Sequence, residues 1–237
     1  MDYGTLYLIP CPISDETAPW DVLPAANRDV MNSLDYFIVE NKRSARRFLS
    51  KAGVERPIGE LEFRELNEHT AAGREVEELV KPLLEGRSAG VISEAGVPGV
   101  ADPGALVVEA CHRRGIRVVP LVGPSSIILA VMASGLNGQS FAFNGYLPVK
   151  PPERAKAIRF FERRALTEGQ SQLFIEAPYR NGKLMEQLVQ TLGAETRLTV
   201  AVELTAPGGR IETRTAGEWR RRPLPELNKR PAIFIIG

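Results

Sequence analysis

Short apolar runs alternate with segments of helical character through the first 134 residues, and this alternation limits the possible folds more than any other feature. The apolar runs cover residues 5–9, 35–40, 89–93 and 116–122, and residues 61–66 predict a further short strand. Helices are predicted between them over residues 24–34, 43–51, 71–85, 106–114 and 124–134. Strands that alternate with helices at this spacing indicate βαβ units around a parallel sheet.

The pattern pauses near residues 135–139 and then changes. Strands predicted over 141–143 and 172–176 flank a helix over 152–167, and another helix covers 181–192. Strands over 198–204, 210–216 and 232–236 follow with few helices between them, which is typical of mixed or antiparallel pairing. We therefore predict an α/β protein of two domains, residues 1–136 with a parallel sheet and residues 137–237 with a mixed sheet.

Composition and charge exclude several classes of protein. The 30 lysines and arginines nearly balance the 29 aspartates and glutamates, which argues against bulk electrostatic coating of nucleic acid but leaves local basic patches open. Two cysteines and two histidines are too few for a disulfide framework or a cysteine zinc site, so no metal is predicted. The first residues do not resemble a signal peptide, and the longest apolar run, 127–133, is far below the ~20 residues of a membrane helix. We expect a soluble, cytoplasmic protein.

A loop rich in glycine and proline over residues 93–104 is the strongest functional signal. It holds three glycines, two prolines and two carboxylates, and it follows a predicted strand of the parallel sheet. Ligands of such sheets bind at the carboxyl ends of the strands, where a stiff loop exposes backbone donors and acceptors to a polar cofactor. The chain has no phosphate-loop, dinucleotide-fingerprint, nucleophile-elbow or zinc-protease motif, which disfavours NTPases, common dehydrogenases, α/β-hydrolases and zincins.

Five stretches of sequence together resemble the tetrapyrrole methylase superfamily and, within it, the ribosomal small-subunit RNA (cytidine-2′-O)-methyltransferases. They cover residues 4–13, 40–43, 93–104, 115–126 and 143–148, in matching order, and the third and fourth stretches also match in spacing. The chain departs from the family's usual residues at Ser14-Asp15, at Asn41-Lys42 and at Glu94. The resemblance implies a two-domain fold with S-adenosylmethionine in a cleft between the domains, a homodimer, and methyl transfer to a ribose 2′-hydroxyl of small-subunit ribosomal RNA.

The resemblance also implies which residues line the cofactor. Those from the first domain are Pro10, Glu94, Val97, Ser126 and Ile127, and those from the second are Glu176, Leu204 and Ala232. A surface carboxylate at Glu94 and a helix N-cap at Ser126 are the simpler structural interpretations. Methyl transfer itself depends on positioning, and it requires neither a covalent nucleophile nor a metal.

A ribose hydroxyl is a poor nucleophile and gains from a general base, for which Glu40 and His69 are the candidates. A solvated loop histidine is the simpler interpretation of His69. Arg43 either anchors a phosphate or solvates its helix. Alternative functions are methylation of a tetrapyrrole or another small molecule, and a non-catalytic module that binds the cofactor.

Basic residues gather in three segments, 42–51, 150–164 and 220–222, and such patches can follow an RNA backbone. For each segment alone, a solvated helix face explains the charge as well. We predict that the helix over 154–164 contacts substrate phosphates, with Arg159 and Arg163 as RNA-binding residues. The spacing of Ile158, Phe160 and Phe161 predicts that these three side chains bury the opposite side of that helix.

Overall fold

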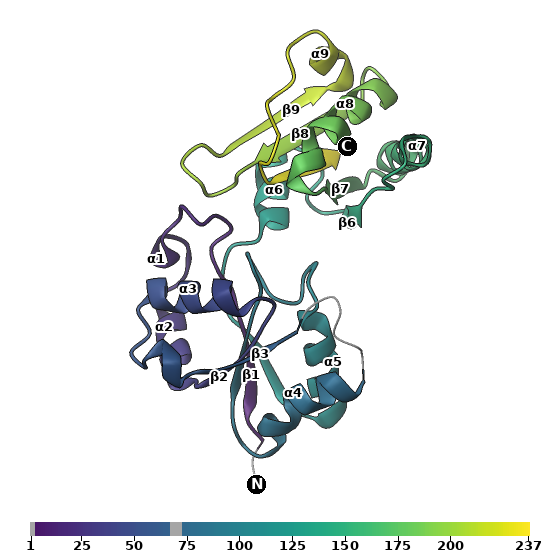
Figure 1. Cartoon of the computed structure of the whole chain (residues 1–237). Coiled ribbons are helices and arrows are strands. Elements are labelled where there is room, and N and C mark those ends of the chain that lie inside the picture. Colours follow the sequence, from purple (N-terminus) through teal and green to yellow (C-terminus); the bar gives the residue numbers. More distant parts are fainter. Residues whose placement is uncertain (1–2, 67–72) are drawn as a thin grey trace. The chain divides into compact units, whose positions relative to one another are not determined.

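Five parallel strands form the sheet of the first part of the chain in the computed structural model, which describes residues 3–66 and 73–237. The strand order is β3-β2-β4-β1-β5, and every neighbouring pair is parallel (Figure 1). This confirms the α/β class with a parallel sheet. The strands are β1 (Thr5–Ile9), β2 (Tyr36–Val39), β3 (Glu62–Glu65), β4 (Ala89–Ile92) and β5 (Arg117–Pro120).

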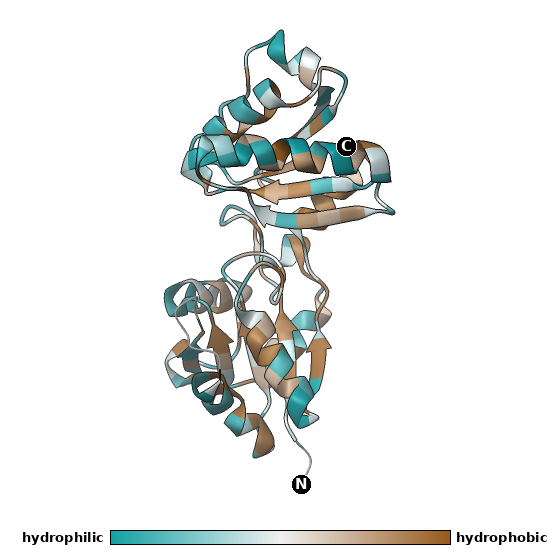
Figure 2. Cartoon of the chain, turned by 90° about the vertical axis from the view of Figure 1, so that its right-hand side faces the viewer, coloured by the Kyte–Doolittle hydropathy of each residue, from teal (hydrophilic) through white to brown (hydrophobic). Residues whose placement is uncertain are grey.

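Helices cover both faces of this sheet because successive strand residues point to opposite sides. On β2, Tyr36 and Ile38 pack with the helices α4 (Arg74–Leu84) and α5 (Gly104–Arg114). Phe37 and Val39 pack with the opposite layer, which contains α1 (Pro19–Val22), α2 (Ala26–Ser33) and α3 (Lys42–Ala52), with the short 3₁₀ helix η1 (Ile58–Glu60) beside it. The strand interiors are correspondingly apolar in Figure 2. The start of the helix predicted over 71–85 lies outside the described residues.

The chain divides into two compact units, residues 1–125 and 126–237. The sequence pattern places this boundary later, after residue 136. The difference arises from α6 (Ser126–Ser134), because its buried residues Ile127 and Ala130 pack against Leu173, Ala201 and other residues of the second sheet. A helix that buries its apolar side on the second sheet belongs to the second unit.

The second unit is built on a mixed sheet of order β6-β7-β10-β8-β9. Only β6 and β7 are parallel, and the other pairs are antiparallel, which confirms the predicted mixed sheet. Its strands are β6 (Phe141–Tyr146), β7 (Ser171–Ile175), β8 (Arg197–Val202), β9 (Arg210–Thr215) and β10 (Ala232–Ile236). Its further helices are α7 (Pro151–Glu168), η2 (Pro178–Arg180), α8 (Asn181–Thr191) and α9 (Ala216–Arg220).

Helix α9 is absent from the sequence prediction, although it carries a large core residue. Trp219 is 1 % exposed, and its Nε1 donates to the carbonyl oxygen of Leu198 at 3.0 Å. Thr215 and Glu218 form a capping box at the start of α9, and that S/T-x-x-E spacing is the sequence signal that could have identified it. Arg220, predicted as part of a basic patch, donates to main-chain carbonyls of α8 and the turn after it.

Two side chains of α7 correct the predicted orientation of this helix. Arg154, the first residue of the helix predicted to contact phosphates, is buried and donates to Gln187 on α8. Phe160, predicted to bury its side chain, is 46 % exposed, whereas Ile158 is buried and Phe161 packs on the core. The helix is therefore rotated relative to the prediction, with Phe160 on its outer side.

One surface network ties β2, β3 and the turn before β4 together. Arg87 donates to Asp35 through Nε at 2.9 Å and to Glu62 through Nη1 at 2.6 Å, and its guanidinium lies over the Tyr36 ring. The hydrogen bond from Arg87 lowers the pKa of the Asp35 carboxyl, and the nearby charges of Arg87 and Arg56 lower it further.

The interaction between Asp35 and Arg87 predicts how the stability of the protein depends on pH. A carboxyl with a lowered folded pKa stabilises the protein above its unfolded pKa, near 3.9, and loses that contribution as pH falls through the folded value. Because Asp35 is 40 % exposed, we expect Asp35→Asn to lower the free energy of unfolding by only about 0.5 kcal/mol at pH 7. Urea unfolding should show that the difference in free energy of unfolding between the two proteins shrinks as the pH falls below about 3.9. A difference that stays constant from pH 7 to pH 3 would contradict an ionic origin.

Candidate active site

The loops after β1, β4 and β5 meet at the carboxyl-end edge of the parallel sheet. Cys11 and Gly96 exchange two backbone hydrogen bonds, of 2.9 and 3.2 Å, and so join the loop after β1 to residues 93–104. The Cys11 Sγ–H donates to the Ser93 carbonyl oxygen at 3.1 Å. Burial raises the pKa of this thiol to about 12, so Cys11 fastens the loop and does not act as a nucleophile.

Glu40 and Glu94 come together at the same edge from β2 and β4. Oε2 of Glu40 accepts the backbone N–H of Glu94 at 3.2 Å, and Ser44 on α3 donates to Oε1 of Glu94 at 3.2 Å. Asn41 caps α3 by accepting the backbone N–H groups of Arg43 and Ser44. The Glu94 carboxylate is exposed and is held in place by the start of α3.

The glycine-rich loop has an unusual backbone. Gly96, Gly99 and Ala101 all have positive φ, at 71°, 82° and 61°, and a Cβ at Gly99 would meet no atom within 4 Å. Asp102 fixes this shape because its carboxylate accepts the N–H of Gly99 at 2.9 Å and that of Gly104 at 2.7 Å. Burial raises the pKa of the Asp102 carboxyl. A fixed loop with open space over its glycine backbone is suited to a polar ligand.

The loop after β5 approaches the loop after β1 more closely than a side chain would allow. A Cβ placed on Gly123 would lie 2.3 Å from both Cβ and Cγ of Pro10, which is itself buried. Real Cβ atoms do not approach carbon this closely, so only glycine permits the observed packing. Pro10, Glu94 and Val97, the predicted cofactor residues of this unit, therefore lie on one interlocked set of loops.

The second unit has its own set of the predicted residues at one sheet edge. The register pairs Ile233 with Ile175 and Ala232 with Val202, so Ala232 lies between the residues that follow β7 and β8. Glu176 and Leu204 are among those residues. The structure thus brings Glu176, Leu204 and Ala232 to the same edge.

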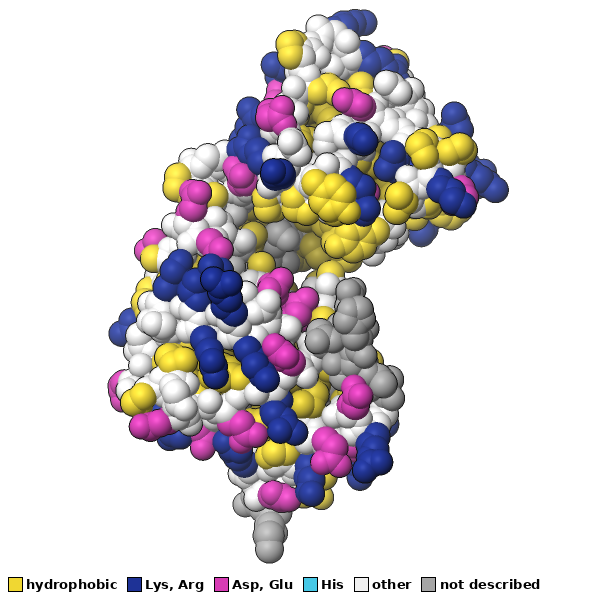
Figure 3. Space-filling view, viewed as in Figure 1, with side chains coloured by type: hydrophobic (Ala, Val, Ile, Leu, Met, Phe, Trp, Pro, Cys, Tyr) yellow, Lys and Arg dark blue, Asp and Glu magenta, His cyan; other side chains and the backbone are white. Residues whose placement is uncertain are grey.

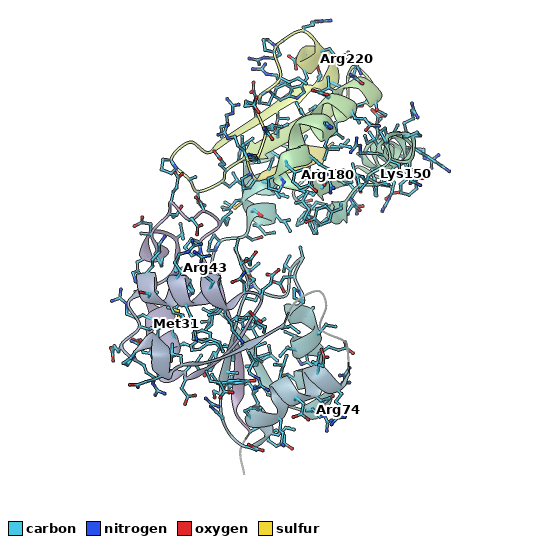
Figure 4. All side chains as sticks on the ribbon, viewed as in Figure 1. Met31, Arg43, Arg74, Lys150, Arg180 and Arg220 are labelled. Carbon is cyan, nitrogen blue, oxygen red and sulfur yellow. The ribbon has the colours of Figure 1, made fainter. Side chains whose placement is uncertain are left out.

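Glu176 carries the most distinctive side chain of this edge. Its carboxylate is 1 % exposed, and Oε1 accepts from Arg180 Nη2 at 2.6 Å and from the N–H of Ala177 at 2.7 Å (Figure 4 labels Arg180). Oε2 of Glu176, Nε of Arg180 and Oδ1 of Asn181 are buried and have no hydrogen-bond partner within the described residues. Such orphaned atoms indicate a place where water or a bound polar group completes the network. Arg180 and Asn181 had no predicted role.

The remaining predicted residues are more scattered. Ser126 and Ile127 begin α6, where Ile127 is buried in the core of the second unit and needs no ligand to explain it. Arg43 is exposed on α3 (Figure 4), and Arg159 and Arg163 are exposed on α7. His69 lies outside the described residues.

Neither a metal cluster nor a membrane-spanning helix is found in the part of the chain that the structure describes. In the ranges 3–66 and 73–237, no group of three or more histidine, cysteine, aspartate or glutamate side chains is arranged to hold a metal ion. Nor does any helix in these ranges have the length and apolar character to cross a membrane.

Two solved structures that share this fold carry the name of a methyltransferase. The structure of the methyltransferase CobJ matches the whole chain with a TM-score of 0.64 at 16 % identity, covering 94 % of CobJ. Uroporphyrin-III-C-methyltransferase from Thermus thermophilus matches 99 % of the chain with a TM-score of 0.55 at 19 % identity, covering 92 % of that chain. At these identities the likeness establishes the fold alone.

The sequence establishes the family. The model of the Tetrapyrrole (Corrin/Porphyrin) Methylases matches residues 6–219, and the chain belongs to that family and is a methyltransferase. Its relatives include proteins named "Ribosomal RNA small subunit methyltransferase I". The one from Xylella fastidiosa is 31 % identical over 98 % of this chain and 80 % of its own length. The one from Escherichia coli O157:H7 is 32 % identical over 98 % of this chain and 77 % of its own.

Proposed function

We propose that this methyltransferase uses S-adenosylmethionine to methylate a ribose 2′-hydroxyl of small-subunit ribosomal RNA, in the cytoplasm. The observation that carries the proposal is the 93–104 loop, fixed by the Cys11–Gly96 bonds and by Asp102 in a chain that matches ribosomal RNA methyltransferases over 98 % of its length. The cofactor supplies an activated methyl group on a sulfonium when it is bound. The protein then has to hold that methyl group and the attacking oxygen in line.

The cofactor residues that we propose follow the two sheet edges. In the first unit, the backbone at Gly96, Val97 and Gly99 offers donors and acceptors, and the exposed Glu94 carboxylate attracts a cationic group. In the second unit, the unpartnered oxygen of Glu176 is available to a donor. Ser126, Ile127, Leu204 and Ala232 complete the proposed set.

Glu40 has two proposed roles. It holds the Glu94 backbone through Oε2, which makes it a positioning residue for the loop. It is also the proposed general base for the ribose hydroxyl, since a carboxylate can accept that proton as the oxygen attacks. Glu40→Gln keeps an acceptor for the Glu94 N–H and removes the base. A normal cofactor affinity together with slower methyl transfer would therefore show that Glu40 acts as the base in addition to positioning the loop.

Three exposed arginines are the proposed contacts to RNA. Arg43 stands at the start of α3, and Arg159 and Arg163 lie on the outer side of α7. The guanidinium group of each is able to pair with a phosphate. RNA is favoured over a small-molecule substrate by the names of the relatives and by these exposed cations.

The function is tested by methyl transfer from radiolabelled S-adenosylmethionine. Purified small ribosomal subunits, naked small-subunit RNA and uroporphyrinogen are offered as separate acceptors. We expect label in the RNA of the subunits, in a nucleotide whose ribose is methylated. Label only in the porphyrinoid would establish the small-molecule function instead, and cofactor binding with no transfer to any acceptor would indicate a non-catalytic module.

Cofactor binding is a separate prediction. Calorimetry should give a Kd for S-adenosylmethionine or its demethylated product in the micromolar range, about −8 kcal/mol. At a ligand concentration of about 100 times Kd, linkage adds about 2.7 kcal/mol to the free energy of unfolding and raises the melting temperature. Absence of both the heat and the thermal shift would refute the proposed cofactor.

We also propose that the protein is a homodimer. On α6, the apolar side chains of Ile128 and Met132 are 46 % and 73 % exposed, and a second copy of the chain would cover them. Light scattering at micromolar concentration should therefore give about twice the 26.0 kDa of one chain, and Met132→Lys should lower that value. A wild-type mass near one chain would refute the dimer.

A further inference from the structure

The outer side of α7 presents one aromatic ring among cations. Lys156, Arg159, Phe160 and Arg163 stand at helical positions i, i+3, i+4 and i+7, which share one face, and all four side chains are exposed. Figure 3 shows dark blue and yellow side chains together at the right-hand edge of the second unit, where Figure 1 places α7. We call these four residues the α7 stripe.

The Phe160 ring is held from beneath by a chain of aromatic contacts. It meets Phe161 edge-on, with ring centroids 5.2 Å apart, and Phe161 meets the buried Phe174 of β7 in the same way at 5.0 Å. The Arg163 guanidinium carbon lies 5.8 Å from the Phe160 centroid. Phe160 is thus connected to the core through Phe161 and Phe174. Its side chain loses little further conformational entropy when a ligand packs on the ring.

The charge around this ring is positive and is not neutralised within the described residues. Lys156, Arg159 and Arg163 make no ion pair there, whereas Arg164 on the flank pairs with Glu168 at 2.9 Å.

The acids of α7 are all engaged elsewhere. Glu153 pairs with Lys150, Glu168 with Arg164, and Glu162 accepts from the Gly193 N–H and the Thr196 hydroxyl. The stripe therefore offers an apolar ring and unopposed positive charge to the same partner.

We propose that the α7 stripe is a stacking platform for one unpaired nucleobase of the RNA substrate, with Phe160 as the stacking residue and the cations on the adjoining phosphates. The inference rests on the proposed function and extends it, because it requires the RNA at this contact to be single-stranded. Bases stack on aromatic side chains and guanidinium planes only where they are free of a duplex. The negative charges of phosphates would neutralise the three unpaired cations, whereas a neutral or positively charged partner would leave them uncompensated.

The test separates stacking from general apolar docking through Phe160→Leu and Phe160→Trp. Leucine keeps an apolar side chain and removes the ring, and tryptophan enlarges the ring. Binding is measured by fluorescence anisotropy with a short labelled oligouridylate and with an abasic ribose-phosphate oligomer of the same length. We expect Phe160→Leu to weaken binding of the oligouridylate about tenfold and that of the abasic oligomer less than about twofold, with Phe160→Trp at or above the wild-type affinity.

Leu166→Ala is the matched control, since Leu166 is 64 % exposed on the same helix beyond the stripe. It should leave both affinities unchanged, and circular dichroism and melting temperature should show all variants folded. Equal binding of both oligomers by wild type and Phe160→Leu would overturn the proposal. So would a loss of ribosomal-subunit binding in Phe160→Leu with normal oligouridylate binding, because that result indicates docking on a protein of the subunit.

The two proposals fail in different ways. If wild-type protein transfers no methyl group to any RNA, the proposed function is wrong whatever the oligonucleotides show. If wild-type protein methylates small subunits and Phe160→Leu does so with unchanged KM, the proposed function stands and the stacking platform is wrong.

Discussion

Gly123→Ala should lower kcat/KM for methyl transfer about a hundredfold, although it adds a single methyl group at a residue with no predicted role in binding. The new Cβ would stand 2.3 Å from two carbons of Pro10, so the loop after β5 and the loop after β1 have to separate by more than about 1 Å to reach ordinary van der Waals distance. Cys11, which adjoins Pro10, holds the 93–104 loop through its two backbone hydrogen bonds with Gly96. A displacement of Pro10 therefore also moves the loop backbone that we propose binds the cofactor. Steady-state kinetics and calorimetry with the cofactor would measure it.

Gly59→Ala provides a matched control in the same unit. Gly59 lies in η1, its φ is not positive, and an added Cβ there meets no atom within 4 Å. We expect kcat/KM and cofactor affinity to match those of wild type. If Gly123→Ala has normal kinetics and a normal melting temperature, the loops yield to the extra methyl group and the interlocked edge does not position the cofactor.

Reversing the charge of Arg159 and Arg163 together should raise KM for ribosomal substrate at least about tenfold and reduce its dependence on salt. The slope of log affinity against log salt concentration should fall by about 0.7–0.9 for each phosphate that the protein no longer neutralises. Cofactor affinity should stay at the wild-type value. The measurement is the KM of the Arg159→Glu, Arg163→Glu double variant across a series of salt concentrations, with cofactor affinity from calorimetry.

A second double variant, Arg113→Glu with Arg114→Glu, makes the same change of net charge on α5, where both arginines pair with Glu77. It should leave KM and the salt slope near those of wild type, since no RNA contact is proposed there. Equal effects of the two double variants would show that net charge alone sets the affinity. An unchanged salt slope in the α7 variant would mean that Arg159 and Arg163 remain in solvent.

The strands could be predicted from sequence because short apolar runs in this chain are bounded by glycine, proline or charge. The run at 232–236 matches β10, and the run at 5–9 matches β1. The order of the strands could not be predicted in this way. β1 pairs with β4 and β5, and no local pattern specifies partners more than 80 residues away. The register that places Ala232 between the residues after β7 and β8 is likewise a long-range property.

Side-chain orientation on α7 was harder to predict because its sequence has two partly apolar sides. Phe160 and Phe161 are adjacent, so only one of them can face Phe174, and the structure places Phe161 there. Arg154 is buried because Gln187 on α8 accepts its Nε–H, an interaction that spacing within α7 does not reveal.

The candidate site was predictable where it depends on local sequence and was missed where it depends on packing. The glycines and carboxylates of residues 93–104 identified the loop. The fastening of that loop by Cys11 and the close approach of Gly123 to Pro10 follow from tertiary contacts. Arg180 had a usable signal, since it stands four residues after Glu176, but the sequence does not show that the carboxylate is buried.

The interior position of β1 has a consequence for how the first unit assembles during synthesis. β1 lies between β4 and β5, so Thr5–Ile9 has no neighbour in the sheet until residues 89–92 and 117–120 have been translated. Until then the backbone N–H and C=O groups of this apolar segment have no partner strand on either side. Segments of this kind are prone to aggregation while the chain is incomplete. Long-range parallel pairing of this kind is slow, because the entropy cost of closing a large loop comes before any stabilising contact is made. The pairing of β1 with β4 and β5 is therefore expected to be a late event in the folding of the first unit.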